Sequence, residues 1–111
     1  MKKSQAVDAF GALAQENRLD VLRMLVKAGP KGVAAMAIGA KLGMQPSKTS
    51  FHLAHLERAG LIESRKESRS VIYSANYDKI ADLVRFLMED CCAGDRRVVA
   101  ACSEIVASCK C

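Results

Sequence analysis

The sequence has no apolar run long enough to cross a membrane: its longest, residues 33–40, covers eight residues, whereas a bilayer needs about twenty. No cysteine occurs among the first ninety residues, so a disulfide framework for the body of the chain is excluded. An internal repeat and a low-complexity linker are also missing. The apolar stretch after Met1 is interrupted by Asp8, and we therefore expect no secretory signal peptide and a cytoplasmic protein.

Length and composition are those of one globular domain. The chain has 111 residues, of which 50% are hydrophobic and 26% are charged. The formal net charge is +5, and it is uneven, because residues 1–76 carry +6 and residues 77–111 carry −1. A basic body favours a polyanionic partner, with nucleic acid ahead of a membrane surface. We expect a single domain over residues 1–111, with a cysteine-rich segment at 91–111.

Helical periodicity dominates the first sixty residues. Ser4 can cap a first helix, and a second helix is predicted over residues 17–28, where Gly29 and Pro30 end it. The apolar stripes expected to face a core are Val7, Phe10, Leu13 and Ala14 in the first helix and Leu19, Leu22, Leu25 and Val26 in the second.

Two further helices with a short turn between them are predicted next. Residues 33–42 form the third, and its small residues Ala37, Gly39 and Ala40 indicate that another helix packs closely against it. After a turn at Gly43, Pro46 opens a fourth helix that ends at Gly60 and buries Leu53, Leu56 and Ala59. Two helices joined by a glycine turn are typical of a helix-turn-helix.

The periodicity then changes from 3.6 to 2. Residues 61–65 and 71–75 are predicted strands of a two-stranded β-hairpin with a charged tip at 66–70. Asn76 or Asp78 can cap a fifth helix. Its stripe is Ile80, Leu83, Val84, Leu87 and Met88. Gly94 ends this helix, and a short final helix is predicted around residues 98–106.

The thirteen residues from Ser50 to Ile62 carry a family signature. They read Ser-Phe-His-Leu-Ala-His-Leu-Glu-Arg-Ala-Gly-Leu-Ile and match Ser-x-His-Leu-x-x-Leu-x-x-Ala-Gly-Leu-(Ile/Val). The chain thus resembles the bacterial ArsR/SmtB family of winged-helix metal-sensing repressors over roughly residues 4–92. One departure is Ser68 at the hairpin tip, where many relatives have glycine. The resemblance implies a mainly α, winged helix-turn-helix fold and a homodimer built from the first and fifth helices, although the two stripes could also be intramolecular core.

Polar residues at the start of the fourth helix and basic residues on the hairpin are the candidate DNA contacts. A recognition helix presents its N-terminal end to base edges in the major groove, and basic side chains contact phosphates or the minor groove. The predicted partner is double-stranded operator DNA. The candidates are Gln45, Ser47, Lys48, Thr49, Ser50 and His52 on the helix and Arg65, Lys66 and Arg69 on the hairpin. Alternatively, Ser47 only caps the helix and the hairpin charges are solvated; His55 is expected to pack against neighbouring elements.

All five cysteines lie within the last twenty-one residues. In a reduced compartment thiolates are soft metal ligands. Three of them suit trivalent arsenic or antimony, and four suit Zn²⁺ or Cd²⁺. The candidate ligands are Cys91, Cys92 and Cys102, with Cys109 or Cys111 as possible substitutes.

The resemblance implies which effector these cysteines bind. The chain has no cysteine in residues 33–42 and no histidine after His55, which excludes two other metal sites of the family. It is similar to the arsenite-responsive members with adjacent cysteines at the end of the fifth helix, so As(III) or Sb(III) is the expected effector. Another thiophilic metal (Cd, Pb, Zn or Cu) and a redox switch, in which Cys91 or Cys92 forms a disulfide with Cys102, stay open as alternatives.

An enzyme is the other class to weigh against a regulator. A thiol oxidoreductase or arsenate reductase needs an anion-binding loop beside its nucleophile, or a Cys-x-x-Cys at a strand-to-helix turn. The sequence has neither. We therefore predict a regulator without catalytic residues.

Overall fold

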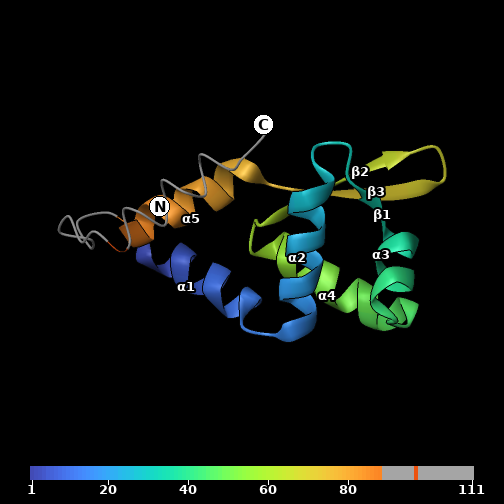
Figure 1. The fold of residues 1–111 in the computed structure, drawn as a ribbon, viewed down its shortest axis with the longest axis horizontal. Coiled ribbons are helices and arrows are strands. Elements are labelled where there is room, and N and C mark those ends of the chain that lie inside the picture. Colours follow the sequence, from blue (N-terminus) through green and yellow to red (C-terminus); the bar gives the residue numbers. More distant parts are fainter. Residues whose placement is uncertain (89–96, 98–111) are drawn as a thin grey trace.

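The computed structural model describes residues 1–88 and residue 97 and has a winged helix-turn-helix architecture (Figure 1). This part of the chain forms five helices and three strands. In chain order they are α1 (Lys3–Leu13), α2 (Glu16–Ala28), β1 (Val33–Ala34), α3 (Ala35–Leu42), α4 (Pro46–Arg58), β2 (Ile62–Glu67), β3 (Ser70–Ala75) and α5 (Tyr77–Met88). The predicted fold class is confirmed. The predicted helix at 98–106 and all five cysteines lie outside the described residues.

The sheet has three antiparallel strands, in the order β1-β3-β2, where the sequence predicted two. Val33 pairs with Tyr73, so the predicted start of the third helix at residue 33 was wrong by two residues. Gly32 allows the extra strand. Its φ is +73°, and a Cβ there would lie 2.5 Å from the Tyr73 carbonyl oxygen, so only glycine lets the chain approach β3 this closely.

The buried face of α1 is one residue out of phase with the predicted stripe. Ala6, Ala9 and Ala12 are buried, while Val7 and Phe10 are 61% and 36% exposed. Alanine brings the helix backbone close to its neighbours, and α1 packs against α2, α4 and α5. Val7 and Phe10 therefore lie on the outer side of α1 in the single chain, whereas Leu13 packs against the core.

The α2 stripe was half right. Leu22 and Leu25 are buried as predicted, but Val21 completes the buried face, and Leu19 and Val26 are exposed. These core residues join Ile38, Leu53, Leu56, Leu61, Ile62, Ala75 and Leu83 in one hydrophobic cluster.

Helix boundaries follow local capping. Of the two candidate caps of α5, Asn76 is the one observed: its Oδ1 accepts from the Lys79 backbone N–H (3.2 Å), and its Nδ2 donates to the Gly60 carbonyl (3.0 Å). At the start of α4 the cap position belongs to Gln45, with Pro46 as first helical residue, so Ser47 is not the cap. Likewise α1 begins one residue before Ser4. No helix among residues 1–88 is long and apolar enough to span a membrane.

Candidate nucleic-acid interface

The α3–α4 crossing positions the candidate recognition helix. Gly43 adopts a left-handed conformation (φ +65°) that ends α3, and the Met44 N–H donates to the Gly39 carbonyl (2.9 Å). A Cβ on Gly39 would lie 2.7 Å from Thr49 Oγ1. The predicted close packing of another helix against α3 is therefore confirmed at Gly39, whereas Ala40 is exposed.

The predicted DNA contacts on α4 separate onto two faces. Gln45, Ser47, Lys48 and Ser50 are exposed around the helix N-terminus. Thr49 and His52 are only 3% and 5% exposed and lie on the same side as Leu53 and Leu56. The Thr49 hydroxyl donates to the Gln45 carbonyl (3.0 Å).

Burial therefore corrects the prediction that Thr49 and His52 contact DNA. Residues at i, i+3, i+4 and i+7 share one helix side, and from Thr49 this pattern runs through His52 and Leu53 to Leu56. The sequence alone contains this spacing. The prediction followed the polar side chains of Thr49 and His52 instead of their position on the helix.

His52 belongs to a junction between three helices. The Arg18 Nε donates to the Ala12 carbonyl at the end of α1 (2.6 Å), and its Nη1 lies 3.4 Å from His52 Nδ1. Because a guanidinium only donates, Nδ1 is the acceptor and the ring proton is on Nε2. Burial lowers the pKa of His52, and the nearby charges of Arg18, Lys48 and His55 lower it further, which keeps the ring neutral. His55, predicted to be the packing residue, is partly exposed.

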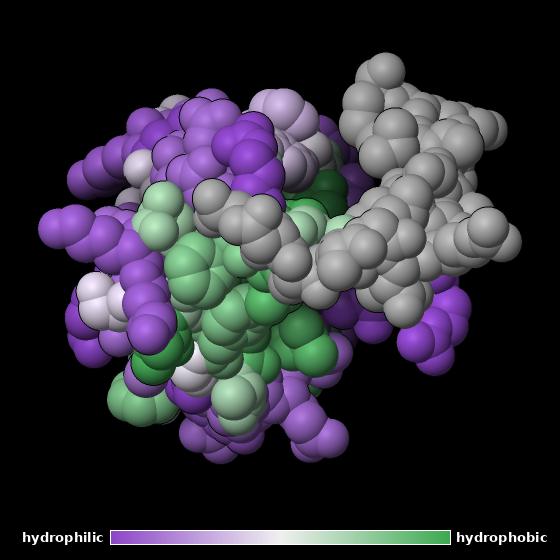
Figure 2. All heavy atoms as spheres, turned by 90° about the vertical axis from the view of Figure 1, so that its left-hand side faces the viewer, coloured by the Kyte–Doolittle hydropathy of each residue, from purple (hydrophilic) through white to green (hydrophobic). Residues whose placement is uncertain are grey.

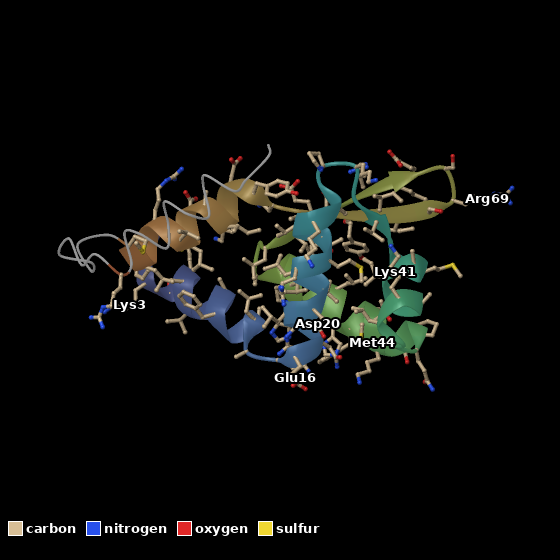
Figure 3. The ribbon with its side chains drawn as sticks, in the orientation of Figure 1. Lys3, Glu16, Asp20, Lys41, Met44 and Arg69 are labelled. Carbon is tan, nitrogen blue, oxygen red and sulfur yellow. The ribbon has the colours of Figure 1, made fainter. Side chains whose placement is uncertain are left out.

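The basic residues of the β2–β3 hairpin, which forms the wing, have two different environments. Arg65 donates to two carbonyls of the loop before β1, Pro30 (3.2 Å) and Lys31 (2.6 Å), and pairs with Glu67 (3.2 Å). Its guanidinium therefore holds the wing to the body of the domain, a role the sequence did not indicate. Lys66 and Arg69 are exposed, and Figure 3 shows Arg69 at the wing tip, directed away from the rest of the molecule.

The turn at the wing tip tolerates the departure at Ser68. Glu67 pairs with Ser70, so Ser68 and Arg69 form a two-residue turn. Ser68 has φ +55°, the positive value for which glycine is preferred at the first central position. The hairpin thus forms with a mildly strained residue in place of the glycine.

Sequence analysis missed one exposed aromatic residue on α4. Phe51 is 63% exposed and lies on the side opposite Leu53 and Leu56. Ser47, Ala54 and Arg58, all exposed, share that side with it at the spacing i, i+4, i+7, i+11. The helical spacing of these four residues is the sequence signal that could have identified this face.

A second exposed surface lies at the opposite end of the molecule, where α1 and α5 meet (Figure 1). Figure 2 looks onto this end and shows hydrophobic side chains gathered in one area, bordered by hydrophilic residues. Val7 and Phe10 on α1 and Val84 on α5 are exposed hydrophobic residues of these two helices. We refer to these three residues as the α1/α5 face.

The metal-site prediction rests on the cysteines, which lie outside the described residues. Within residues 1–88, His, Cys, Asp and Glu form no cluster of three that could hold an ion. Any thiolate site of this chain therefore has to draw on the segment after α5.

Comparison with known proteins identifies the architecture independently. A family described as a helix-turn-helix domain matches residues 13–65. The transcriptional activator HlyU of Vibrio cholerae is 31% identical over 84 residues, which cover 76% of this chain and 75% of that protein. A probable mercury resistance operon repressor of Streptomyces lividans is 29% identical over 93 residues, covering 84% and 70%.

Solved structures agree. An ArsR-like transcriptional regulator from Rhodococcus sp. RHA1 superposes with a TM-score of 0.69 at 28% identity, covering 96% of both chains. The homodimeric winged helix-turn-helix DNA-binding domain of a possible ArsR-family regulator from Mycobacterium bovis gives 0.64 at 29% identity, covering 78% of this chain and 81% of that one.

Proposed function

Because the chain belongs to the ArsR family of winged-helix transcriptional regulators, we propose that it is a cytoplasmic, homodimeric repressor that leaves its operator when a thiophilic effector binds. The observation that carries this proposal is the exposed polar end of α4 in a domain whose wing carries Lys66 and Arg69. A helix-turn-helix with such a surface binds DNA through its second helix.

The described residues suggest how the DNA is bound. Gln45, Ser47 and Ser50 have short or flexible polar side chains that can hydrogen-bond to base edges at the N-terminal end of α4. Lys48, Lys66 and Arg69 supply charge for phosphates, whose neutralisation gives much of the affinity and makes it salt-dependent. A homodimer presents two copies of α4 to two half-sites, so the expected operator is pseudo-palindromic.

The proposed effector is trivalent arsenic or antimony, bound by Cys91, Cys92 and Cys102. Such an ion forms three bonds to thiolate sulfur in a pyramid, and five cysteines in the last twenty-one residues offer the soft donors it needs. The similarity to a mercury resistance repressor supports a thiophilic effector in general. Cys109 and Cys111 are the reserve candidates for the third ligand.

Release requires the effector to prefer a conformation that DNA does not. Cys91 follows the end of α5 by three residues, and α5 contributes to the α1/α5 face that we assign to the dimer. A change at the end of α5 can therefore alter the angle between protomers and the spacing of the two α4 helices. A coupling of about 1–3 kcal/mol is ordinary for such a switch.

The test is a mobility-shift assay on the DNA upstream of the gene. We expect the reduced protein to bind and arsenite or antimonite to release it, while Cys91→Ser and Cys92→Ser bind DNA but no longer respond. Cys102→Ser is expected to do the same, and truncation after Ala107 to leave the response nearly normal.

The same assay separates the alternatives. Release only by cadmium, lead, zinc, copper(I) or mercury(II) would assign a different ion. Release by diamide that dithiothreitol reverses would assign a redox switch. Absence of binding would contradict the proposal that the upstream DNA contains the operator. Thiol-dependent reduction of arsenate by the protein would contradict the proposal that it is a regulator.

A further inference from the structure

The outward side of α4 carries an apolar group at its centre. Phe51 is 63% exposed, and the exposed residues Ser47 and Ala54 lie one helical turn to either side of it. Burying a phenylalanine side chain is favourable, because its apolar surface is removed from water. Most of the Phe51 side chain is not buried within the domain. It lies on the part of the helix with which a helix-turn-helix protein contacts base edges.

The Phe51 ring is also held in place. It makes edge-to-face contacts with the rings of His52 (5.4 Å between centroids, 69°) and His55 (6.3 Å, 67°). His52 is itself fixed by burial and by Arg18. A ring packed in this way loses little further freedom when it meets a partner.

We propose that Phe51 recognises thymine in the operator by packing its ring against the C5-methyl group in the major groove. The methyl group is the only apolar feature that a base pair presents there, and phenylalanine and alanine are among the residues that contact it. The methyl group of Ala54, one turn further on, extends the same apolar strip. This inference rests on the proposed function. It adds an apolar contact with thymine to the base hydrogen bonds that we assign to Gln45, Ser47 and Ser50.

The position in the helix separates this role from a structural one. Ser47 and Ser50 flank Phe51 toward the N-terminus of α4 and offer hydroxyls. Arg58, one turn beyond Ala54, offers a charge for the DNA backbone. The strip therefore runs from polar through apolar to cationic, as expected for a surface that crosses a groove and ends at phosphate.

The experiment removes only the C5-methyl group of single thymines in the DNA. A duplex enriched by the protein from a random-sequence pool is resynthesised with deoxyuridine in place of one thymine at a time. We expect the wild-type protein to bind about fourfold more weakly when the contacted thymine in a half-site is replaced, as for the loss of one buried CH₂. Phe51→Ala should bind the thymine and uracil duplexes equally, while Phe51→Leu should keep the preference.

Val26→Ala is the matched control, since Val26 is an exposed apolar residue on α2, and it should retain the fourfold difference. A Phe51→Ala protein that still prefers thymine, or a wild-type protein indifferent to uracil at every position, would overturn the assignment. Failure of the wild-type protein to enrich any duplex would instead overturn the proposed function, and the inference with it. Unchanged thermal melting of Phe51→Ala establishes that the variant is folded.

Discussion

At the scale of single residues, burial decides what the polar side chains of α4 do. Thr49 and His52 satisfy partners inside the domain, whereas Ser47, Lys48 and Ser50 face outward from the same helix. Burial and a neighbouring guanidinium both favour the neutral form of an imidazole. His52 therefore connects the stability of the domain to pH.

The first prediction concerns that connection. The folded-state pKa of His52 lies below 6.5, its ordinary value, so the unfolded chain binds the proton more readily. Its contribution is present above about pH 6.5 and is lost as pH falls through that value toward the folded-state pKa. Urea unfolding at pH 7.5 and pH 5 should show the wild-type protein losing stability. His52→Asn, which keeps an acceptor for Arg18 but does not titrate, should lose less over the same interval.

His52→Asn should also be less stable than the wild type at pH 7.5, by about 1–2 kcal/mol, because a ring is removed from a packed site. His55→Asn is the control, since His55 is partly exposed, and it should keep the acid sensitivity of the wild type. An unchanged pH dependence in His52→Asn, or a flattened one in His55→Asn, would show that another group is responsible.

At the scale of elements, the α3–α4 crossing depends on one missing methyl group. Gly39 and Thr49 meet where the two helices are closest, and a Cβ on Gly39 would lie 2.7 Å from Thr49 Oγ1 and 3.2 Å from the Met44 carbonyl oxygen. Atoms at those separations must move apart. The orientation of α4 on the domain therefore depends on this contact.

The second prediction is a double-mutant cycle at that contact. Gly39→Ala should lower the free energy of unfolding by about 1–3 kcal/mol, as for other overpacked sites, despite the higher helix propensity of alanine. Thr49→Ala removes the hydroxyl that the new methyl group meets, so Gly39→Ala should cost at least about 0.5 kcal/mol less in that background. Additive effects in denaturant unfolding would mean that the contact does not limit the crossing.

The elements themselves were largely predictable, because helix periodicity, capping and glycine stops are local signals. The sequence predicted Pro46 at the start of α4, and it offered Asn76 as one of two candidate caps of α5. The β1 strand was not, because two residues of extended chain have no periodicity, and their pairing with Tyr73 depends on a contact across forty residues. The phase of α1 was missed because large apolar side chains look like core, whereas Ala6 and Ala9 occupy it.

The candidate site was predictable in position and only partly in detail. The exposed start of α4 and the charged wing followed from the sequence. The anchoring role of Arg65 and the Arg18–His52 contact did not, because each joins segments more than thirty residues apart. Phe51 was missed for a different reason, since exposure of an apolar residue is seen only once the opposite side of the helix is known to be buried.

At the scale of the whole molecule, the two exposed surfaces have different chemistry. Exposed polar and basic residues surround Phe51 on α4 and lie on the wing, while hydrophobic side chains gather at the end of the molecule where α1 and α5 meet (Figure 2). A contiguous exposed apolar area on a small domain marks an interaction site. A second copy of the chain covering this face would form a closed two-fold dimer, and the two α4 helices would then act together on one duplex.

The last prediction tests that arrangement with one charge. Val84 on α5 is 50% exposed, and Val84→Glu would place a carboxylate in the proposed apolar contact between protomers, where an unpaired charge costs several kcal/mol. Sedimentation equilibrium should therefore show a shift from dimer to monomer. Operator affinity should fall by at least about tenfold, the equivalent of 1.4 kcal/mol, because a monomer contacts one half-site only. Leu19→Glu, which places the same charge on a 44% exposed leucine of α2 that is not part of this face, should leave the dimer intact. A Val84→Glu protein that still sediments as a dimer would place the interface elsewhere. That result would also contradict the proposed mechanism in which a change at the end of α5 alters the spacing of the two α4 helices.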